Sequence, residues 1–128
     1  MYYILMIILG ILGAESRFAL ESTINNSNYP YATLLINMIG CLLLGFMYYF
    51  FVEAKSSTDQ IVAMISTGFV GSFTTFSTFE LEVFKMFRLN QYSKALNYFF
   101  LTLFGGLLSV FLGYCLSKLI IIKRGKSK

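Results

Sequence analysis

Thr67 to Phe79 read TGFVGSFTTFSTF and interrupt the third of four long apolar segments in this sequence. Gly68 and Gly71 weaken a helix at this point, and Ser and Thr hydroxyls bond readily to the local backbone, so we predict a broken helix near mid-span. Backbone groups freed inside a bilayer must be satisfied by protein, water or ions. The freed carbonyls can hold a cation, and the N-terminus of the second half-helix can attract an anion.

Aromatic rings and hydroxyls alternate through this stretch. The rings are spaced four, three and three residues apart, which places them on one face wherever the chain is helical. A plain packing seam would not need the hydroxyls between them. Ring edges are the positive part of the aromatic quadrupole, and hydroxyls can replace part of an anion's hydration shell, so we favour a path for a small anion. The rings are Phe69, Phe73, Phe76 and Phe79, and the hydroxyls are Ser72, Thr74, Thr75, Ser77 and Thr78.

The composition of the whole chain indicates a membrane protein. Of its 128 residues, 57% are hydrophobic and 12% are charged, whereas about a quarter of the residues in soluble domains are charged. The four apolar segments cover about 2–22, 31–52, 60–87 and 94–122, and each reaches the roughly 20 residues that a spanning helix needs. We therefore predict one all-α domain over residues 1–128, with four transmembrane helices joined by short polar connectors.

The first segment is expected to be retained as a helix. Glu15 and Arg17 lie where the core of a signal peptide should be apolar. Ionisable residues inside a span are functional candidates by default. Arg17 would either attract anions at a vestibule or extend to the lipid headgroups, and these two interpretations are equally favoured.

Other residue types exclude several classes of function. The sequence has no histidine, and no nucleophile lies beside a plausible base, so an enzyme is not expected. Cys41 and Cys115 lie inside apolar segments and indicate neither a disulfide framework nor a metal site.

Three further polar positions lie inside the predicted spans. Asn37, in the middle of the second segment, is either a structural hydrogen-bonding group between helices or an NH2 donor that faces an anion path. Glu80 and Glu82 follow the break, where a carboxylate near a half-helix N-terminus is favourable, so we assign them a structural role.

Small residues recur every four positions on the last segment, a pattern typical of close helix contacts in membranes. Two glycines on the second segment are predicted to serve the same purpose. The pattern predicts tight packing either within the chain or against a second subunit. These residues are Gly105, Ser109, Gly113 and Ser117 on the last segment, and Gly40 and Gly45 on the second.

Charge is unevenly placed along the chain, whose net charge is +4. The basic tail reads as facing solvent or lipid headgroups rather than nucleic acid. With four spans, the tail, the N-terminus and Lys55 share one side of the membrane, and the positive-inside rule favours the cytoplasm for that side. The tail contains Lys118, Lys123, Arg124, Lys126 and Lys128, and the opposite side carries Lys85, Arg88 and Lys94.

Several motifs resemble the small bacterial fluoride channels of the CrcB/Fluc type. Gly68 to Phe79 resembles the third-helix signature of that family almost throughout, and the similarity spans the chain. The other matching stretches are Gly13 to Phe18 in the first helix, Asn37 to Gly40 in the second, and Tyr98, Thr102 and Gly106 in the fourth. The sequence departs from the family at Leu9, Ala32 and Leu42, positions that concern helix packing more than the pore.

The resemblance implies a passive fluoride exporter in the bacterial cell membrane, built as an antiparallel dimer with two pores. Its partners would be the fluoride ion, a second subunit and membrane lipid, and a structural sodium ion would lie at the dimer centre. The implied roles are a ring pair lining the path (Phe76 and Phe79), polar pore contacts (Asn37, Ser77, Thr78 and Tyr98), a vestibule cation (Arg17) and sodium ligands (the backbone carbonyls of Gly71 and Thr74).

The second subunit is either an identical chain or a paralogue. An antiparallel homodimer requires one chain to insert in both orientations, yet the basic tail favours a single orientation. We therefore hypothesise that the partner is an oppositely oriented paralogue.

Two other functions compete with this reading. A small dual-topology, proton-coupled multidrug exporter also has four spans and a carboxylate in its first helix, here Glu15. The predicted break and the nearby Arg17 argue against it. A membrane scaffold without transport activity is the third possibility.

Overall fold

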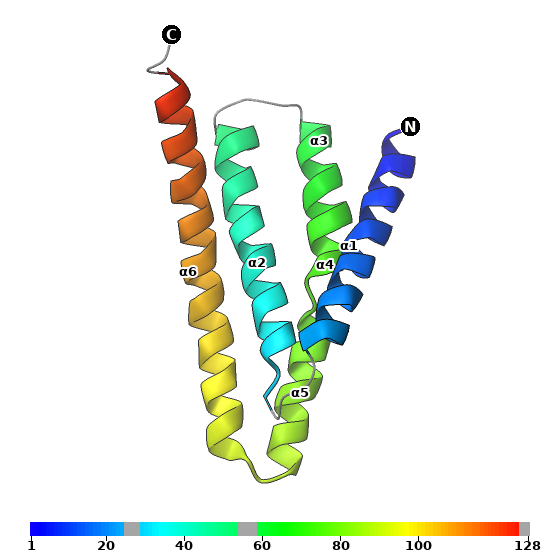
Figure 1. Ribbon diagram of the computed structural model, residues 1–128, viewed down its shortest axis with the longest axis vertical. Coiled ribbons are helices and arrows are strands. Elements are labelled where there is room, and N and C mark those ends of the chain that lie inside the picture. Colours follow the sequence, from blue (N-terminus) through cyan, green and yellow to red (C-terminus); the bar gives the residue numbers. More distant parts are fainter. Residues whose placement is uncertain (25–28, 54–58, 126–128) are drawn as a thin grey trace.

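The computed structural model describes residues 1–24, 29–53 and 59–125, and every regular element within these ranges is a helix. Parts of the predicted connectors, together with Lys55, Lys126 and Lys128, lie outside the described residues. Figure 1 shows the helices arranged side by side along the long axis of the molecule. In chain order they are α1 (Tyr2–Ile24), α2 (Tyr31–Met47), η1 (Tyr48–Glu53), α3 (Asp59–Ala63), η2 (Met64–Val70), α4 (Gly71–Phe73), α5 (Phe76–Arg88) and α6 (Tyr92–Gly125).

Four helical stretches are long and apolar enough to cross a membrane, which confirms the predicted all-α, four-span class. They are Tyr2–Ile24, Tyr31–Phe51, Gln60–Arg88 and Tyr92–Lys123. The second and third include π-helical turns, η1 and η2, which the apolar pattern did not predict. Because π-helical turns inside α-helices are rare and often lie near functional sites, the position of η2 directly before the predicted break is informative.

The turn between α5 and α6 is short and makes these helices antiparallel neighbours. Asn90 adopts a left-handed backbone (φ 58°), a conformation that asparagine tolerates better than most residues. Its amide donates to the carbonyl of Phe87 at 3.0 Å, and the amide of Gln91 donates to Met86 at 2.9 Å. The end of α5 is thereby capped before α6 begins at Tyr92.

Helices α2 and α6 pack backbone to backbone through glycines. A Cβ on Gly45 would overlap the backbone of Val110, and one on Gly113 would overlap the carbonyl of Leu42. Gly105 likewise lies against Met38 of α2. The predicted small-residue pattern therefore serves packing within the chain at these positions.

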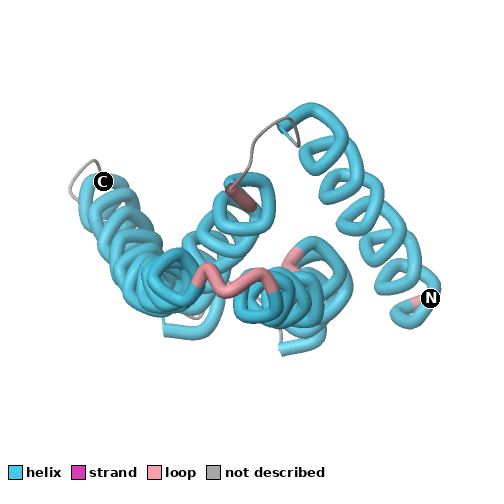
Figure 2. Tube along the Cα trace, turned by 90° about the horizontal axis from the view of Figure 1, so that it is seen from below, coloured by secondary structure: helices cyan, strands magenta, loops and turns pink. Residues whose placement is uncertain are grey.

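The spans form an open arc rather than a closed bundle. In Figure 2, α6 and α1 lie at opposite ends, with α2 and the third span between them. Helix α1 packs against η2 and α4, with Gly13 lying against the backbone of Phe69 and Phe73. Many large apolar side chains stay exposed on the outer helices, such as Ile7 and Phe104. In a membrane such faces meet lipid or another protein.

Candidate functional site

The third span is interrupted at two residues, Thr74 and Thr75. Their backbones are extended, with φ and ψ of −76° and 155° at Thr74 and −143° and 107° at Thr75. Helix α4 ends at Phe73 and α5 begins at Phe76, with the interruption visible in Figure 1. The predicted break is therefore confirmed, but it is shorter than the glycine- and hydroxyl-rich stretch that signals it.

Asn37 on α2 binds the backbone of Thr75 with both ends of its amide. The Nδ2 group donates to the carbonyl of Thr75 at 3.1 Å, and the amide of Thr75 donates to Oδ1 at 2.9 Å. Asn37 thus forms the structural bond between helices that was one of its two interpretations. Since an amide NH2 has two protons, the second proton can still be donated elsewhere.

Thr75 also caps the second half-helix. Its hydroxyl oxygen accepts from the amide of Thr78 at 3.3 Å and donates to the hydroxyl of Thr78 at 2.8 Å. Threonine is a favoured N-cap because its oxygen satisfies one of the amides left over at a helix start. The local sequence Thr75 to Thr78 therefore encodes the restart of the helix.

These side-chain bonds replace two backbone bonds of a continuous helix. There, the amide of Thr75 would donate to the carbonyl of Gly71, and the amide of Thr78 to that of Thr74. Instead, the amide of Thr75 donates to the side chain of Asn37, and the amide of Thr78 donates to the hydroxyl of Thr75. Gly71 and Thr74 are the residues whose carbonyls are predicted cation ligands, and Gly71 is exposed on the surface of the chain.

A second polar cluster joins α2, α5 and α6. The hydroxyl of Thr33 donates to one oxygen of Glu82 at 2.8 Å, and the hydroxyl of Tyr98 donates to the other at 2.7 Å. Thr33 and Tyr98 are buried in the chain. A carboxylate inside a membrane needs such donors, so Glu82 has the predicted structural role. Glu82 and Tyr98 were predicted as polar positions from the sequence, but Thr33 was not. The signal for Thr33 is that a carboxylate inside a span requires donors on neighbouring spans.

The four phenylalanines do not form one stripe, because the break divides them. Phe69 and Phe73 stack on each other in the first half of the span, with ring centroids 5.8 Å apart. Phe76 and Phe79 form a separate tilted pair, also with centroids 5.8 Å apart. Phe79 is only 6% exposed, whereas Phe76 is 70% exposed and available to another chain.

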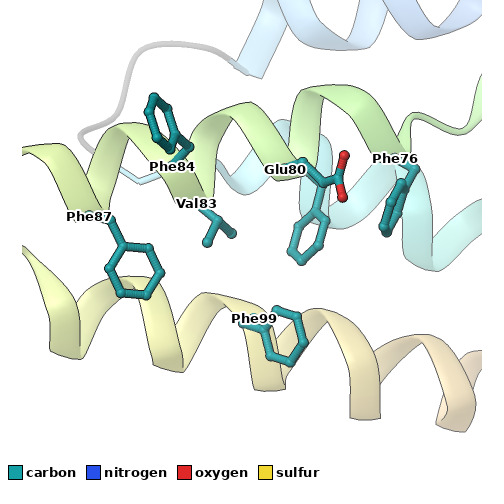
Figure 3. Close-up of a pocket in the computed structure, with 7 residues that line it drawn as sticks. Phe76, Glu80, Val83, Phe84, Phe87 and Phe99 are labelled. Atoms are coloured by element: carbon teal, nitrogen blue, oxygen red, sulfur yellow. The ribbon is translucent and has the colours of Figure 1, made fainter.

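The second ring pair lies at one end of an open groove between α5 and α6. The groove has a volume of about 310 Å³, and Figure 3 shows Phe99 of α6 facing the α5 side chains across it. Phe99, which the sequence reasoning missed, packs 6.0 Å from Phe79 between ring centroids. The lining residues are Phe76, Phe79, Glu80, Val83, Phe84, Phe87 and Phe99.

The remaining predicted residues are carried by α5 and α1. Ser77 is exposed and Thr78 half-buried on the first turn of α5. On α1, Arg17 is half-buried, and Glu15 is exposed. Helix α1 contacts the half of the third span that precedes the break, so these two residues are carried by a different helix from the ring pair.

Tyr29 lies outside the spans and closes the end of the Glu82 cluster. Its ring meets that of Tyr98 edge-on, with centroids 5.6 Å apart, and the Lys94 ammonium lies 5.7 Å from its ring centroid. Burial, with a smaller contribution from Tyr31, raises the pKa of Tyr29.

Comparison with known proteins assigns the chain to a family. Residues 4–114 match the family described as CrcB-like protein, Camphor Resistance (CrcB). A protein of Bacillus cereus named fluoride-specific ion channel FluC 1 is 41% identical over 124 residues, covering 94% of this chain and 90% of that protein. Fluoride-specific ion channel FluC 2 of Listeria monocytogenes is 34% identical over 128 residues, covering 100% and 98%. Because the family match covers most of the chain and the relatives align along nearly all of it, this multi-pass bacterial membrane protein belongs to the CrcB family.

Proposed function

We propose that this chain is one subunit of a fluoride-specific ion channel that lets cytoplasmic fluoride leave the cell passively through pores at an antiparallel dimer interface. The names of its relatives support fluoride as the transported ion. A channel requires no catalytic residue. The observation that carries the proposal is the break in the third span. It brings freed carbonyls, hydroxyls and a ring pair, of which Phe76 is exposed, together within a few residues.

The fluoride path would follow the first turn of α5. Phe76 and Phe79 offer ring edges, which attract an anion without supplying water. Ser77, Thr78 and the second amide proton of Asn37 would replace part of the hydration shell of the ion. Fluoride that accumulates in the cytoplasm after HF entry would then leave down its electrochemical gradient, with no need for ATP.

The carbonyls of Gly71 and Thr74 would hold a structural sodium ion together with the same two groups of a second subunit. Oxygen donors suit a hard cation, and both carbonyls have lost their helical donors to side chains. Among the described residues, no group of three or more His, Cys, Asp or Glu side chains is placed to hold a metal. When bound, sodium would supply positive charge at the dimer centre.

The open groove and the exposed Phe76 support a second subunit. A narrow ion path must be closed on all sides, and the groove between α5 and α6 is open in the single chain. Arg17 on α1 would lie near a pore entrance and attract anions. The partner would be an identical chain or, given the basic tail, an oppositely oriented paralogue.

A fluoride-electrode assay tests this function. Liposomes that contain the protein, alone or mixed with an oppositely oriented paralogue, should release loaded fluoride, whereas chloride-loaded liposomes should not release chloride. Phe79→Ile should slow release about tenfold, because an aromatic contact worth about 1.4 kcal/mol at the barrier changes a rate by that factor. Phe111→Ile, on an exposed position of α6 three turns beyond Phe99, is the matched control and should leave the rate unchanged.

The outcomes separate the alternatives. Release that is absent from the single polypeptide and also from its mixture with a paralogue would contradict the proposal. Glu15→Gln should leave fluoride release intact, since Glu15 is exposed on α1, a different helix from the ring pair. A proton-coupled drug exporter would instead lose transport with this change, and a scaffold would show no flux that Phe76→Ile could alter.

A further inference from the structure

Gly40 on α2 lies directly against Thr74, the first residue of the break. A Cβ built on Gly40 would overlap the Cγ2 methyl of Thr74. The next nearest atoms are the Cβ of Thr74 at 3.6 Å and the Cγ1 of Val70 at 3.7 Å, which are ordinary contacts. Among the described residues, the Thr74 methyl group is therefore the only close obstacle to a Cβ at position 40.

Gly40 and Asn37 act on neighbouring residues from one face of α2. They are three positions apart, which places them on the same side of the helix. Asn37 binds the backbone of Thr75, and Gly40 accommodates the side chain of Thr74. Both residues of the break are therefore held by α2, a helix distant from them in the sequence.

The side chain of Thr74 is held on two sides. Its hydroxyl donates to the carbonyl of Val70 at 3.0 Å, and its amide donates to the same carbonyl at 3.0 Å. Its methyl occupies the space left by Gly40. Because threonine has two heavy atoms on Cβ, placing both of them fixes χ1 and restricts the backbone that carries the Thr74 carbonyl.

We propose that Gly40 is a positioning residue for the cation site: its missing side chain leaves the space that seats Thr74, and this would hold the Thr74 carbonyl in place to bind the ion. This inference rests on the proposed sodium site. An alanine at position 40 would either rotate the Thr74 side chain away from Val70 or push the Thr74 peptide off α2. The first change would break the bond to Val70 and release the restraint on the Thr74 backbone, and the second would move the carbonyl directly. A ligand displaced by about 1 Å loses much of its effect.

The test uses a rescue. The variants are Gly40→Ala, Thr74→Ser and the double variant, because serine keeps the hydroxyl that binds Val70 but lacks the offending methyl. Gly45→Ala is the control for general packing damage, since its Cβ would overlap the Val110 backbone and not the break. Each full-length protein is measured twice in detergent, in sodium and in potassium buffer, for its unfolding temperature, and once in liposomes for fluoride release.

We expect sodium to raise the unfolding temperature of the unmodified protein and of Thr74→Ser. Gly40→Ala should lose most of this sodium-specific rise and slow fluoride release at least about tenfold. The double variant should recover both to within about twofold of Thr74→Ser alone, because the two positions are coupled. Gly45→Ala should keep its sodium-specific rise even if its unfolding temperature falls in both buffers, and Thr74→Ser should not rescue it.

Different results would overturn different statements. A Gly40→Ala protein with a normal sodium-specific rise, or one that Thr74→Ser fails to rescue, would overturn the positioning role. An unmodified protein that sodium does not stabilise would overturn the sodium site and this inference with it, whether or not fluoride is released. Sodium stabilisation without fluoride release would instead contradict the proposed conduction and leave the Gly40 coupling measurable by unfolding.

Discussion

At the scale of single residues, the break exists because side chains take over hydrogen bonds that the backbone would otherwise make. The side chain of Asn37 accepts a hydrogen bond from the amide of Thr75, and the hydroxyl of Thr75 accepts one from the amide of Thr78. In the sequence, Asn37 is an isolated amide side chain inside an apolar segment, and Thr75 belongs to a run of serine and threonine residues. The cost of extended backbone inside a membrane is offset at Thr75 and Thr78, whose freed amides both have side-chain partners.

Asn37 is the residue whose change should affect the break most directly. Asn37→Ala removes both bonds to Thr75 and should lower the free energy of unfolding by about 1–3 kcal/mol, since a buried amide and carbonyl lose their partners. Asn37→Asp has the same shape and can still accept from the Thr75 amide, but a carboxylate cannot donate to the Thr75 carbonyl. Chemical unfolding in detergent should therefore rank the proteins as unmodified, then Asp, then Ala.

The opposite result has a clear meaning for Asn37. If Asn37→Ala unfolds at the same denaturant concentration as the unmodified protein, the helix has closed over the break without penalty. The two bonds at 2.9 Å and 3.1 Å would then not be what keeps it open.

The Glu82 cluster gives a second prediction at this scale. Thr33→Val and Tyr98→Phe each remove one donor from the carboxylate with little change in shape. Bonds between membrane helices average about 0.6 kcal/mol, whereas bonds to charged groups reach about 1.5–3 kcal/mol, so each change should cost about 1–2 kcal/mol. The double variant should cost more than the sum, because Glu82 then keeps neither donor.

A double-mutant cycle of unfolding free energies measures this excess. Thr102→Val is a suitable comparison, since the Thr102 hydroxyl is buried without a hydrogen-bond partner among the described residues. Strict additivity of Thr33→Val and Tyr98→Phe would show that the two donors act independently and that the carboxylate finds another partner.

At the scale of elements, the sequence predicted what depends on local pattern. The four spans follow from hydropathy and length, and the break follows from glycines and hydroxyls near mid-span. The length of the break was overestimated, because the N-cap at Thr75 restarts the helix immediately. A cap works over three residues, so Thr75 to Thr78 carried this information in the sequence.

What the sequence could not predict depends on contacts between elements. Asn37 and Thr75 are 38 positions apart, and Thr33 and Glu82 are 49 apart, so no local rule pairs them. The π-helical turns, η1 and η2, also lack a pattern in the apolar periodicity. For the same reason, the sequence did not show whether the small residues of α6 pack within the chain or against a second subunit. The structure shows that Gly105 and Gly113 pack against α2.

The contact between α2 and α6 leads to a prediction about elements. Gly113→Val places a branched side chain against the Leu42 carbonyl and should force the two helices apart. Overpacking of this kind typically costs about 1–3 kcal/mol, and a backbone obstacle cannot rotate away as a side chain can. Leu116→Ala, at a position of α6 that is 48% exposed, should change the unfolding free energy by less than about 0.5 kcal/mol. Equal effects of the two changes would contradict this view of the interface.

At the scale of the whole molecule, the open arc of one chain would leave the proposed fluoride path incomplete. Phe76 and Gly71 are exposed beside the break, and the groove between α5 and α6 has only two walls of protein. An ion path needs walls on every side, because lipid cannot satisfy a dehydrated fluoride. A second subunit that is inverted relative to this one would bring the two breaks together at the same depth, since each lies near the middle of its span.

In the proposed antiparallel dimer, assembly would depend on the orientation of each chain in the membrane, and charge should control that orientation. The tail residues Lys123, Arg124, Lys126 and Lys128 favour a cytoplasmic C-terminus, against the weaker pull of Lys85, Arg88 and Lys94 on the other side. A reporter fused to the C-terminus should place it in the cytoplasm in most molecules. Changing Lys123, Arg124, Lys126 and Lys128 to glutamine should produce both orientations. Changing Lys85, Arg88 and Lys94 to glutamine should instead strengthen the original orientation.

The same variants then test what the partner is. If the chain inserts in one orientation and needs an inverted paralogue, the single unmodified polypeptide should release little fluoride from cell-derived vesicles, and the tail variant should release more because it can pair with itself. Full release from the unmodified chain, together with a reporter found equally on both sides of the membrane, would show that the tail does not fix orientation. The chain would then form its dimer from two identical copies, and the hypothesis of a paralogous partner would be wrong.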